Sequence, residues 1–136
     1  MKFDSMLVLA AGFGLALGLA LAPAPALAHH SFAAEFDREL PVELTGAVVR
    51  LEWLNPHARF YINVEDENGD LVEWDFELSS PNGLMRRGWT RNSLKEGDII
   101  SVEGWRAKNA PHVGNARSVT FADGSRVFAG SSGEDD

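Results

Sequence analysis

The stretch VELTGAVVRLEW, residues 42–53, decides the fold because its apolar alternation changes phase partway along. The apolar positions are even-numbered in the first half, up to Val48, and odd-numbered in the second half, up to Trp53. A phase shift of one residue is typical of a β-bulge, and Gly46 permits the bend that accompanies it. We therefore expect one long, bent first strand over residues 42–54.

Two further apolar alternations, residues 58–64 and 71–78, predict a β-hairpin. Facing residues in a hairpin share a face of the sheet, so Val64 is expected to pair with Val72. This register leaves residues 67–69 as a three-residue loop with Gly69 in the left-handed conformation. It also sets three pairs on the outer face: Arg59 with Glu77, Tyr61 with Asp75, and Asn63 with Glu73.

A short helix is expected after the hairpin. Ser80 has the preference of an N-cap, Pro81 that of the first helical position, and Gly88 that of a residue that ends a helix. About two helical turns fit between them.

Two more strands complete the expected domain. They are Ile99–Trp105 and a strand from about residue 116 that continues, after a turn, through Phe128, with residues 106–115 as the loop between them. The order of elements predicts an all-β fold, a small five-stranded OB-fold-like barrel with one short helix between strands 3 and 4. A small open β-sandwich is the alternative.

Residues 1–28 have the pattern of a cleavable secretory signal peptide. Lys2 opens a short basic region, an apolar run follows, and Ala26-x-Ala28 offers the small side chains that signal peptidase recognises. The apolar run is shorter than the roughly 20 residues that span a bilayer, which disfavours the alternative of an uncleaved anchor. We expect a periplasmic protein. Its expected parts are the signal peptide (1–28), an N-terminal arm with aromatic anchors (29–41), the barrel (42–129) and a disordered acidic tail (130–136).

The chain has a formal net charge of -8 and no cysteine. Phosphate binding depends on Lys and Arg, so neither nucleic acid nor an anionic membrane surface is expected as a partner. A metal ion or another small ligand suits the charge better. The acidic row Glu73, Asp75 and Glu77 is interpreted as the solvated side of a two-faced strand, with a surface for a cationic ligand as the alternative.

Four motifs together resemble an uncharacterised family of small exported bacterial proteins. The motifs are His29-His30-Ser31-Phe32, Trp53-Leu54-Asn55-Pro56-His57, Ser80-Pro81-Asn82-Gly83-Leu84 with Gly88-Trp89, and Leu94-Lys95-Glu96-Gly97-Asp98. The His-His-Ser-Phe start after a signal, combined with the Asn-Pro-His turn, is the most specific part. The resemblance implies bacterial export and a single domain, and it brings no assigned activity.

The four histidines are candidate ligands for a transition metal. Cleavage after Ala28 would leave His29 with a free amine, which can chelate one ion together with the imidazole Nδ1, and His30 is adjacent. Such chelates are similar to those of several unrelated exported copper proteins. His57 and His112 lie in the two loops that flank the ligand-binding face of an OB-fold. Nitrogen ligands without thiolates suit copper best, ahead of zinc or nickel.

An interpretation without a metal also fits the sequence. The histidines would then be ordinary loop residues, and the domain would be an OB-type binding or protein-interaction module. Such a module would use exposed aromatic side chains, for which Trp89 and Trp105 are candidates. The sequence contains no cysteine nucleophile and no Gly-x-Ser-x-Gly turn, so we expect a binding protein rather than an enzyme.

Overall fold

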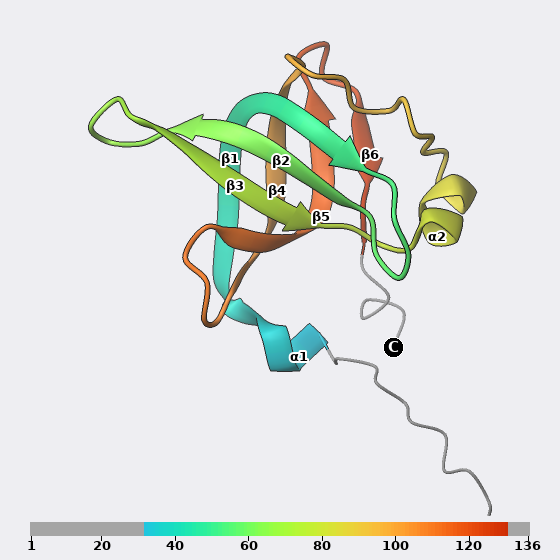
Figure 1. Ribbon diagram of the computed structural model, residues 1–136, viewed down its shortest axis with the longest axis horizontal. Coiled ribbons are helices and arrows are strands. Elements are labelled where there is room, and N and C mark those ends of the chain that lie inside the picture. The colour runs from blue at the N-terminus through green and yellow to red at the C-terminus, as the bar shows by residue number, and fades with distance from the viewer. Residues whose placement is uncertain (1–31, 131–136) are drawn as a thin grey trace, which may run out of the picture.

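The computed structural model describes residues 32–130, which form one barrel with short helices at its ends (Figure 1). The expected signal peptide, His29, His30 and nearly all of the acidic tail lie outside the described residues. The elements in chain order are α1 (Phe32–Glu35), β1 (Phe36–Glu52), β2 (Arg59–Glu65), β3 (Leu71–Glu77), α2 (Pro81–Arg86), β4 (Ile99–Ala107), β5 (Val113–Phe121) and β6 (Arg126–Phe128).

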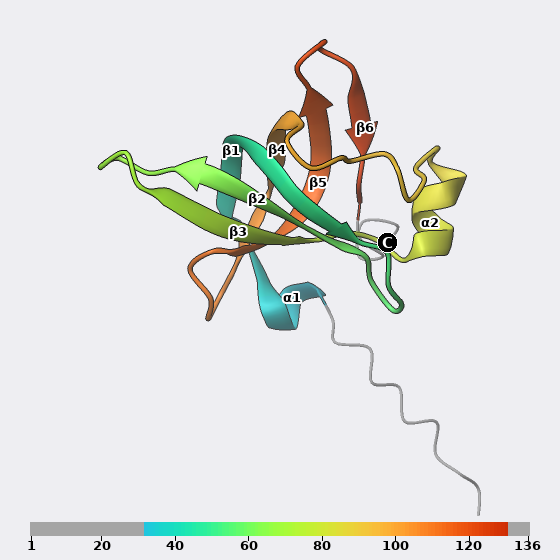
Figure 2. The ribbon, with the colours of Figure 1, turned by 45° about the horizontal axis from the view of Figure 1, so that its top comes forward.

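The strands form a sheet in the order β3-β2-β1-β4-β5-β6, and a further pairing joins β3 to β5. The β3–β5 pairing is parallel, whereas the other pairings are antiparallel. It brings the first five strands into a nearly closed ring, which is visible in both ribbon views (Figures 1 and 2). The expected OB-like barrel, with its helix between β3 and β4, is therefore confirmed over the open sandwich.

β1 makes the barrel possible because it changes partner along its length. Its first half pairs with β4 and its second half with β2, and the two sets of pairs meet at Ala47. The register against β2 shifts between Val48 and Arg50, which confirms the predicted bulge. The strong curvature of β1 is plain in Figure 1.

The start of β1 differs from the prediction. The strand begins at Phe36, within the segment expected to be an arm, and α1 directly precedes it. Phe36 is only 2% exposed and pairs with Ala107 of β4, so burial of this ring accounts for the early start. Asp37, Arg38 and Glu39 interrupt the apolar alternation at this point, which hid the continuation from a pattern based on period two.

The β2–β3 hairpin follows the predicted register. Val64 pairs with Val72, and all three predicted outer pairs are present, including Arg59 with Glu77. Gly69 has a φ of 84°, and Asp66 and Asp70 close the three-residue loop through a backbone hydrogen bond of 2.8 Å. The hairpin was therefore correctly predicted from shared faces and turn chemistry.

α2 covers one end of the barrel. Ser80 caps it as predicted, accepting a hydrogen bond from Gly83 N at 3.2 Å, and Gly88 has a φ of 90°. Trp89, a candidate exposed aromatic, is instead 2% exposed, and its indole donates to Phe128 O at 3.1 Å. The expectation of exposure was wrong because the chain turns inward after α2. The core also contains Val48, Phe60, Ile62, Phe76, Leu84, Ile100, Val102 and Val119.

Within residues 32–130, neither α1 nor α2 is long enough to cross a membrane.

Candidate metal site and the polar barrel face

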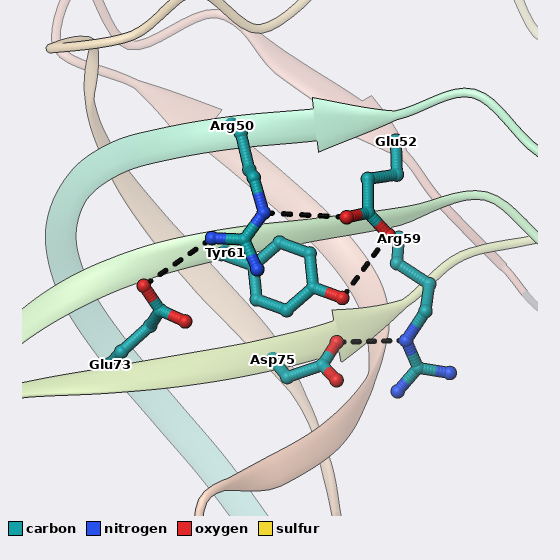
Figure 3. Close-up of polar contacts among 6 residues, drawn as sticks. All are labelled: Arg50, Glu52, Arg59, Tyr61, Glu73 and Asp75. Atoms are coloured by element: carbon teal, nitrogen blue, oxygen red, sulfur yellow. Dashed lines mark hydrogen bonds and ion pairs between the residues drawn. The ribbon is translucent and has the colours of Figure 1, made fainter.

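The outer face of β1, β2 and β3 carries a network of charged side chains around Tyr61 (Figure 3). The Arg50 guanidinium lies 3.5 Å from the centroid of the Tyr61 ring, and the Tyr61 hydroxyl donates to Glu52 at 3.2 Å. Burial, followed by the charges of Asp75 and Glu52, raises the pKa of Tyr61. The network holds the phenol in its neutral form.

The acidic row on β3 is paired with arginines. Glu73 contacts Arg50 at 3.4 Å, while Arg59 reaches Asp75 at 2.8 Å and Glu77 at 3.2 Å. Because each acid of the row has an arginine partner, we interpret the row as the outer side of a two-faced strand. Surface pairs of this kind contribute little stability each.

Glu77 differs from the other two acids because its side chain is only 13% exposed. It lies where β3 meets β5, and its partner across the parallel pairing is Asn115, which is fully buried. Burial raises the pKa of Glu77, and the nearby Glu35 adds to the rise. His57, Arg59 and Asn115 act in the opposite direction.

Asn115 is a buried amide whose two polar atoms lack a hydrogen-bond partner among the described residues. Asn115 lowers the pKa of Glu77 in the manner of a side-chain hydrogen-bond donor, so the carboxylate is the neighbour of the amide although strict hydrogen-bond geometry is not reached. Buried amides are almost always hydrogen-bonded in native proteins, so this amide requires an explanation.

α1 packs against the start of β1 and against Trp105 of β4. The Phe32 ring packs edge-on against Trp105 at 5.4 Å, and Trp105 is the β4 partner of Asn115. Lys108 N donates to Glu35 O at 2.9 Å, which fastens the other end of α1. Phe32 and Phe36 thus act as the anchors that the sequence predicted. Their rings, 5.4 Å apart, hold α1 against Trp105.

His57 belongs to the loop between β1 and β2, and its ring lies next to Leu78, just after the end of β3. Its Nδ1 is 3.2 Å from Leu78 O. A carbonyl oxygen only accepts, so Nδ1 must donate, and Nε2 of the neutral ring is left as a free lone pair. His57 lowers the pKa of Glu77, and its hydrogen-bond partner Leu78 directly follows Glu77 in the chain.

His112 has different surroundings. Its side chain is exposed, and its ring packs at 61° against Trp74, with the centroids 5.4 Å apart. Its carbonyl accepts from Asp75 N at 3.0 Å, which begins the β3–β5 pairing. Trp74 belongs to the core-facing side of β3, whereas Glu77 belongs to the outer side. His112 thus contacts Trp74 and Asp75 of β3, whereas His57 contacts Leu78 just after that strand.

Residues 32–130 hold no group of three or more His, Asp or Glu side chains that could bind a metal by themselves. The sequence analysis named Glu77 only as part of the acidic row and did not single out Asn115. Glu77 lay in an expected strand and Asn115 at the end of an expected loop, and the burial of both follows only from the β3–β5 pairing.

A groove of about 530 Å³ opens at the other side of the barrel, between the first half of β1 and Trp74. Leu40, Val42 and Leu44 give it an apolar wall, and Arg106 is the basic residue that lines it. The volume is within the range of small-molecule sites.

The chain belongs to a family of unknown function (DUF6152), whose model matches residues 17–116. No curated protein matches the chain. Among solved structures, the crystal structure of TiaS in complex with an isoleucine tRNA and ATP is similar, with a TM-score of 0.45 and 18% sequence identity. That match covers 60% of this chain, and the chain spans 18% of the length of the matched chain.

Proposed function

We propose that the processed protein is a periplasmic metal-binding domain that binds one Cu(II) ion. The amine and imidazole of His29 chelate the ion, and His57 supplies a further nitrogen. The observation that carries the proposal is the orientation of His57, whose Nδ1 bonds to Leu78 O and leaves Nε2 free. Histidines that bind metals commonly donate their other ring nitrogen to a carbonyl or carboxylate in this way.

The anchoring of α1 supports a site shared by His29 and His57. Three peptide units separate His29 from Phe32, which limits the distance between their Cα atoms to about 11 Å. Phe32 contacts Trp105, the partner of Asn115, and Glu35 influences Glu77 beside His57. A site that combines His29 with His57 agrees with this anchoring of Phe32 on β4.

The ligand chemistry favours copper. The amine and two imidazoles are nitrogen donors without thiolates, a set that binds Cu(II) more strongly than other divalent first-row ions. The net charge of -8 favours a cation over an anionic ligand. A binding or transfer role fits a domain of this size better than oxidative catalysis.

Copper titration against a competing chelator tests the chelate directly. Protein that starts at His29 should bind one Cu(II), and one residue added before His29 should weaken binding strongly, because the amine leaves the chelate ring. Equal affinity of the native and extended forms would refute the proposal. Binding should also fade below about pH 6, where protons compete for the nitrogen ligands.

His57→Ala and His112→Ala form a matched pair for the third ligand. His57→Ala should weaken copper binding more than His112→Ala, because the His112 ring packs on Trp74 while the Nδ1 bond of His57 to Leu78 O leaves its Nε2 for a metal. The reverse order would assign the third nitrogen to His112. His30 is tested in the same series by His30→Ala.

The groove beside Trp74 favours a second candidate, a metal-free binding module. Its apolar wall would suit a small apolar ligand, which Arg106 would contact beside Glu39 and Glu43. Copper-independent ligand binding that is lost in Arg106→Ala, together with equal copper affinity of native and extended N-termini, would establish this function instead.

A further inference from the structure

Two Asn-Gly pairs, Asn68-Gly69 and Asn82-Gly83, lie in different surroundings. In this dipeptide the backbone nitrogen of the glycine readily approaches the side-chain amide before it, because glycine has no Cβ to obstruct the approach. The first pair belongs to the loop between β2 and β3, and the second belongs to α2. The structure therefore decides which of the two asparagines is open to spontaneous deamidation.

Asn68 lies at the tip of the β2–β3 hairpin, and the bonds that fix it are local. Residues 66–70 are all exposed, and the loop projects away from the barrel in both ribbon views (Figures 1 and 2). Gly69 N donates to Asp66 O at 3.0 Å, and Asn68 N donates to Oδ1 of Asp66 at 2.8 Å. A Cβ placed on Gly69 would have one atom within 4 Å, a carboxylate oxygen of Glu65 at 3.7 Å. The loop can therefore rearrange while the β2–β3 ladder stays paired.

Asn82 carries the same dipeptide in a protected setting. Gly83 is buried, and its N–H donates to Ser80 Oγ at 3.2 Å in the N-cap of α2. A Cβ placed on Gly83 would lie 2.5 Å from Ser79 Oγ, so there is little free space around this residue. The Gly83 nitrogen has to leave the helix to reach the Asn82 side chain, and this breaks the cap. Folding should therefore slow the reaction at Asn82.

Asp123-Gly124 in the β5–β6 loop provides a second comparison. Gly124 and Gly69 share a φ of 84°, and both loops are closed by a backbone hydrogen bond of 2.8 Å. The Asp123 carboxylate, however, accepts from Ser125 N at 2.8 Å and from Ser125 Oγ at 2.6 Å. These bonds lower the pKa of Asp123 and keep it ionised, and an ionised carboxylate is a poor target for a nitrogen nucleophile. Within residues 32–130, the Asn68 amide group is not held in this way.

We infer that Asn68 is a site of spontaneous deamidation and isoaspartate formation in the folded protein. The Gly69 nitrogen attacks Cγ of Asn68 and closes a succinimide ring, while the Cγ–Nδ2 bond breaks and Nδ2 leaves as ammonia with the proton of the Gly69 nitrogen. Water then opens the ring: its hydroxyl adds to a ring carbonyl carbon, and its proton returns to the Gly69 nitrogen. Opening at Cγ gives an aspartate, and opening at the backbone carbonyl carbon gives an isoaspartate. The reaction consumes one water, needs no oxidant, and is independent of the proposed copper function.

Both products change the tip of the hairpin. An aspartate adds a negative charge to a loop that already contains Asp66, Glu67 and Asp70. An isoaspartate places its Cβ in the main chain, which lengthens a loop closed by the 2.8 Å bond from Asp66 N to Asp70 O. Seven residue pairs hold β2 to β3 beyond the loop, so the modification should loosen the tip and leave the barrel folded.

Deamidation of both asparagines is measured in one sample, which makes Asn82 the internal control for Asn68. Purified protein is incubated in mildly alkaline buffer, folded in one series and unfolded in guanidinium chloride in the other, and its proteolytic peptides are followed by mass spectrometry. The two Asn-Gly pairs should react at similar rates in the unfolded chain. In the folded protein we expect the rate at Asn68 to stay within about threefold of its unfolded value, and the rate at Asn82 to fall by about tenfold or more, because loss of the cap adds to its barrier.

Asn68→Gln and Asn82→Gln form a matched pair of variants. Glutamine has the same amide one carbon further from the backbone, so it has to close a larger and less favourable ring. Asn68→Gln should abolish the isoaspartate that forms in folded protein, and Asn82→Gln should leave it unchanged. Circular dichroism checks that both variants fold, and the comparison of folded with unfolded native protein depends on neither.

Protection of Asn68 by folding to the same degree as Asn82 would overturn the inference, as would faster modification of Asn82 in the folded protein. Isoaspartate that persists in folded Asn68→Gln would assign the modification to another residue and would overturn it as well. These results leave the copper titration unaffected, because the proposed copper ligands do not include residues 66–70.

Discussion

Gly114→Ala should destabilise the protein by crowding the aromatic stack next to the barrel seam. A Cβ at Gly114 would lie 2.6 Å from Cε1 and 3.0 Å from Cδ1 of Phe76. Ordinary carbon–carbon contacts are about 3.5–4.0 Å, so the ring would have to move by about 1 Å. Phe76 is fully buried, with Phe60 stacked at 5.4 Å and Trp74 at 5.7 Å, which leaves it little room.

Overpacking of this kind costs about 1–3 kcal/mol, and the rigid stack favours the upper part of that range. Gly88→Ala is the control, because no atom lies within 4 Å of its added Cβ and only its φ of 90° opposes the change. That backbone cost is about 1–2 kcal/mol. Urea unfolding followed by tryptophan fluorescence gives the free energy of unfolding of each variant.

A double-mutant cycle with Phe76→Leu isolates the steric cause. The smaller side chain makes room for the new methyl group, so the double variant should be more stable than the sum of the two single changes indicates, by about 0.5 kcal/mol or more. Strict additivity, or a loss below about 0.5 kcal/mol for Gly114→Ala alone, would refute the packing of Gly114 on Phe76.

Three further predictions concern the cap, the buried acid and the surface network. Ser80→Ala should lower the free energy of unfolding by about 1 kcal/mol in urea titration, because the N-cap bond to Gly83 is lost, and an unchanged midpoint would contradict that role. In metal-free protein the pKa of Glu77 is raised, so the native state keeps the carboxyl proton to a higher pH than the unfolded chain does. The free energy of unfolding should therefore fall as the pH rises from the ordinary glutamate pKa through the raised one. Glu77→Gln should remove this pH-dependent fall from a series of unfolding curves. Glu73→Gln should change the free energy of unfolding by less than about 1 kcal/mol, with an even smaller effect at high salt, because its contact with Arg50 is exposed; a larger loss would show that the network is more than a surface feature.

Much of the fold followed from local patterns. The bulge in β1, the hairpin register and the cap of α2 each depend on residues near one another in sequence, and each was predicted correctly. Two predictions failed where tertiary burial overrode the local pattern. The start of β1 extends back to Phe36, and Trp89 is buried rather than exposed.

The candidate site, like the fold, was predicted only in part from the sequence. The histidines were identified from the sequence because residue type and position after a signal-like segment suggest metal chemistry. Their surroundings could not be predicted, since His112 packs on Trp74 and His57 bonds to Leu78 O only after distant segments come together.

The sequence by itself determined which residues alternate, which faces they share and where the chain turns, because side-chain period and turn chemistry act over a few residues. Only the tertiary structure decided that Glu77 and Asn115 are buried side by side. That pairing arises when β5 lies parallel to β3 and closes the ring, and it joins segments far apart in the chain. Burial depends on what covers a residue, and here the covering strand is β5, which no local pattern around Glu77 encodes.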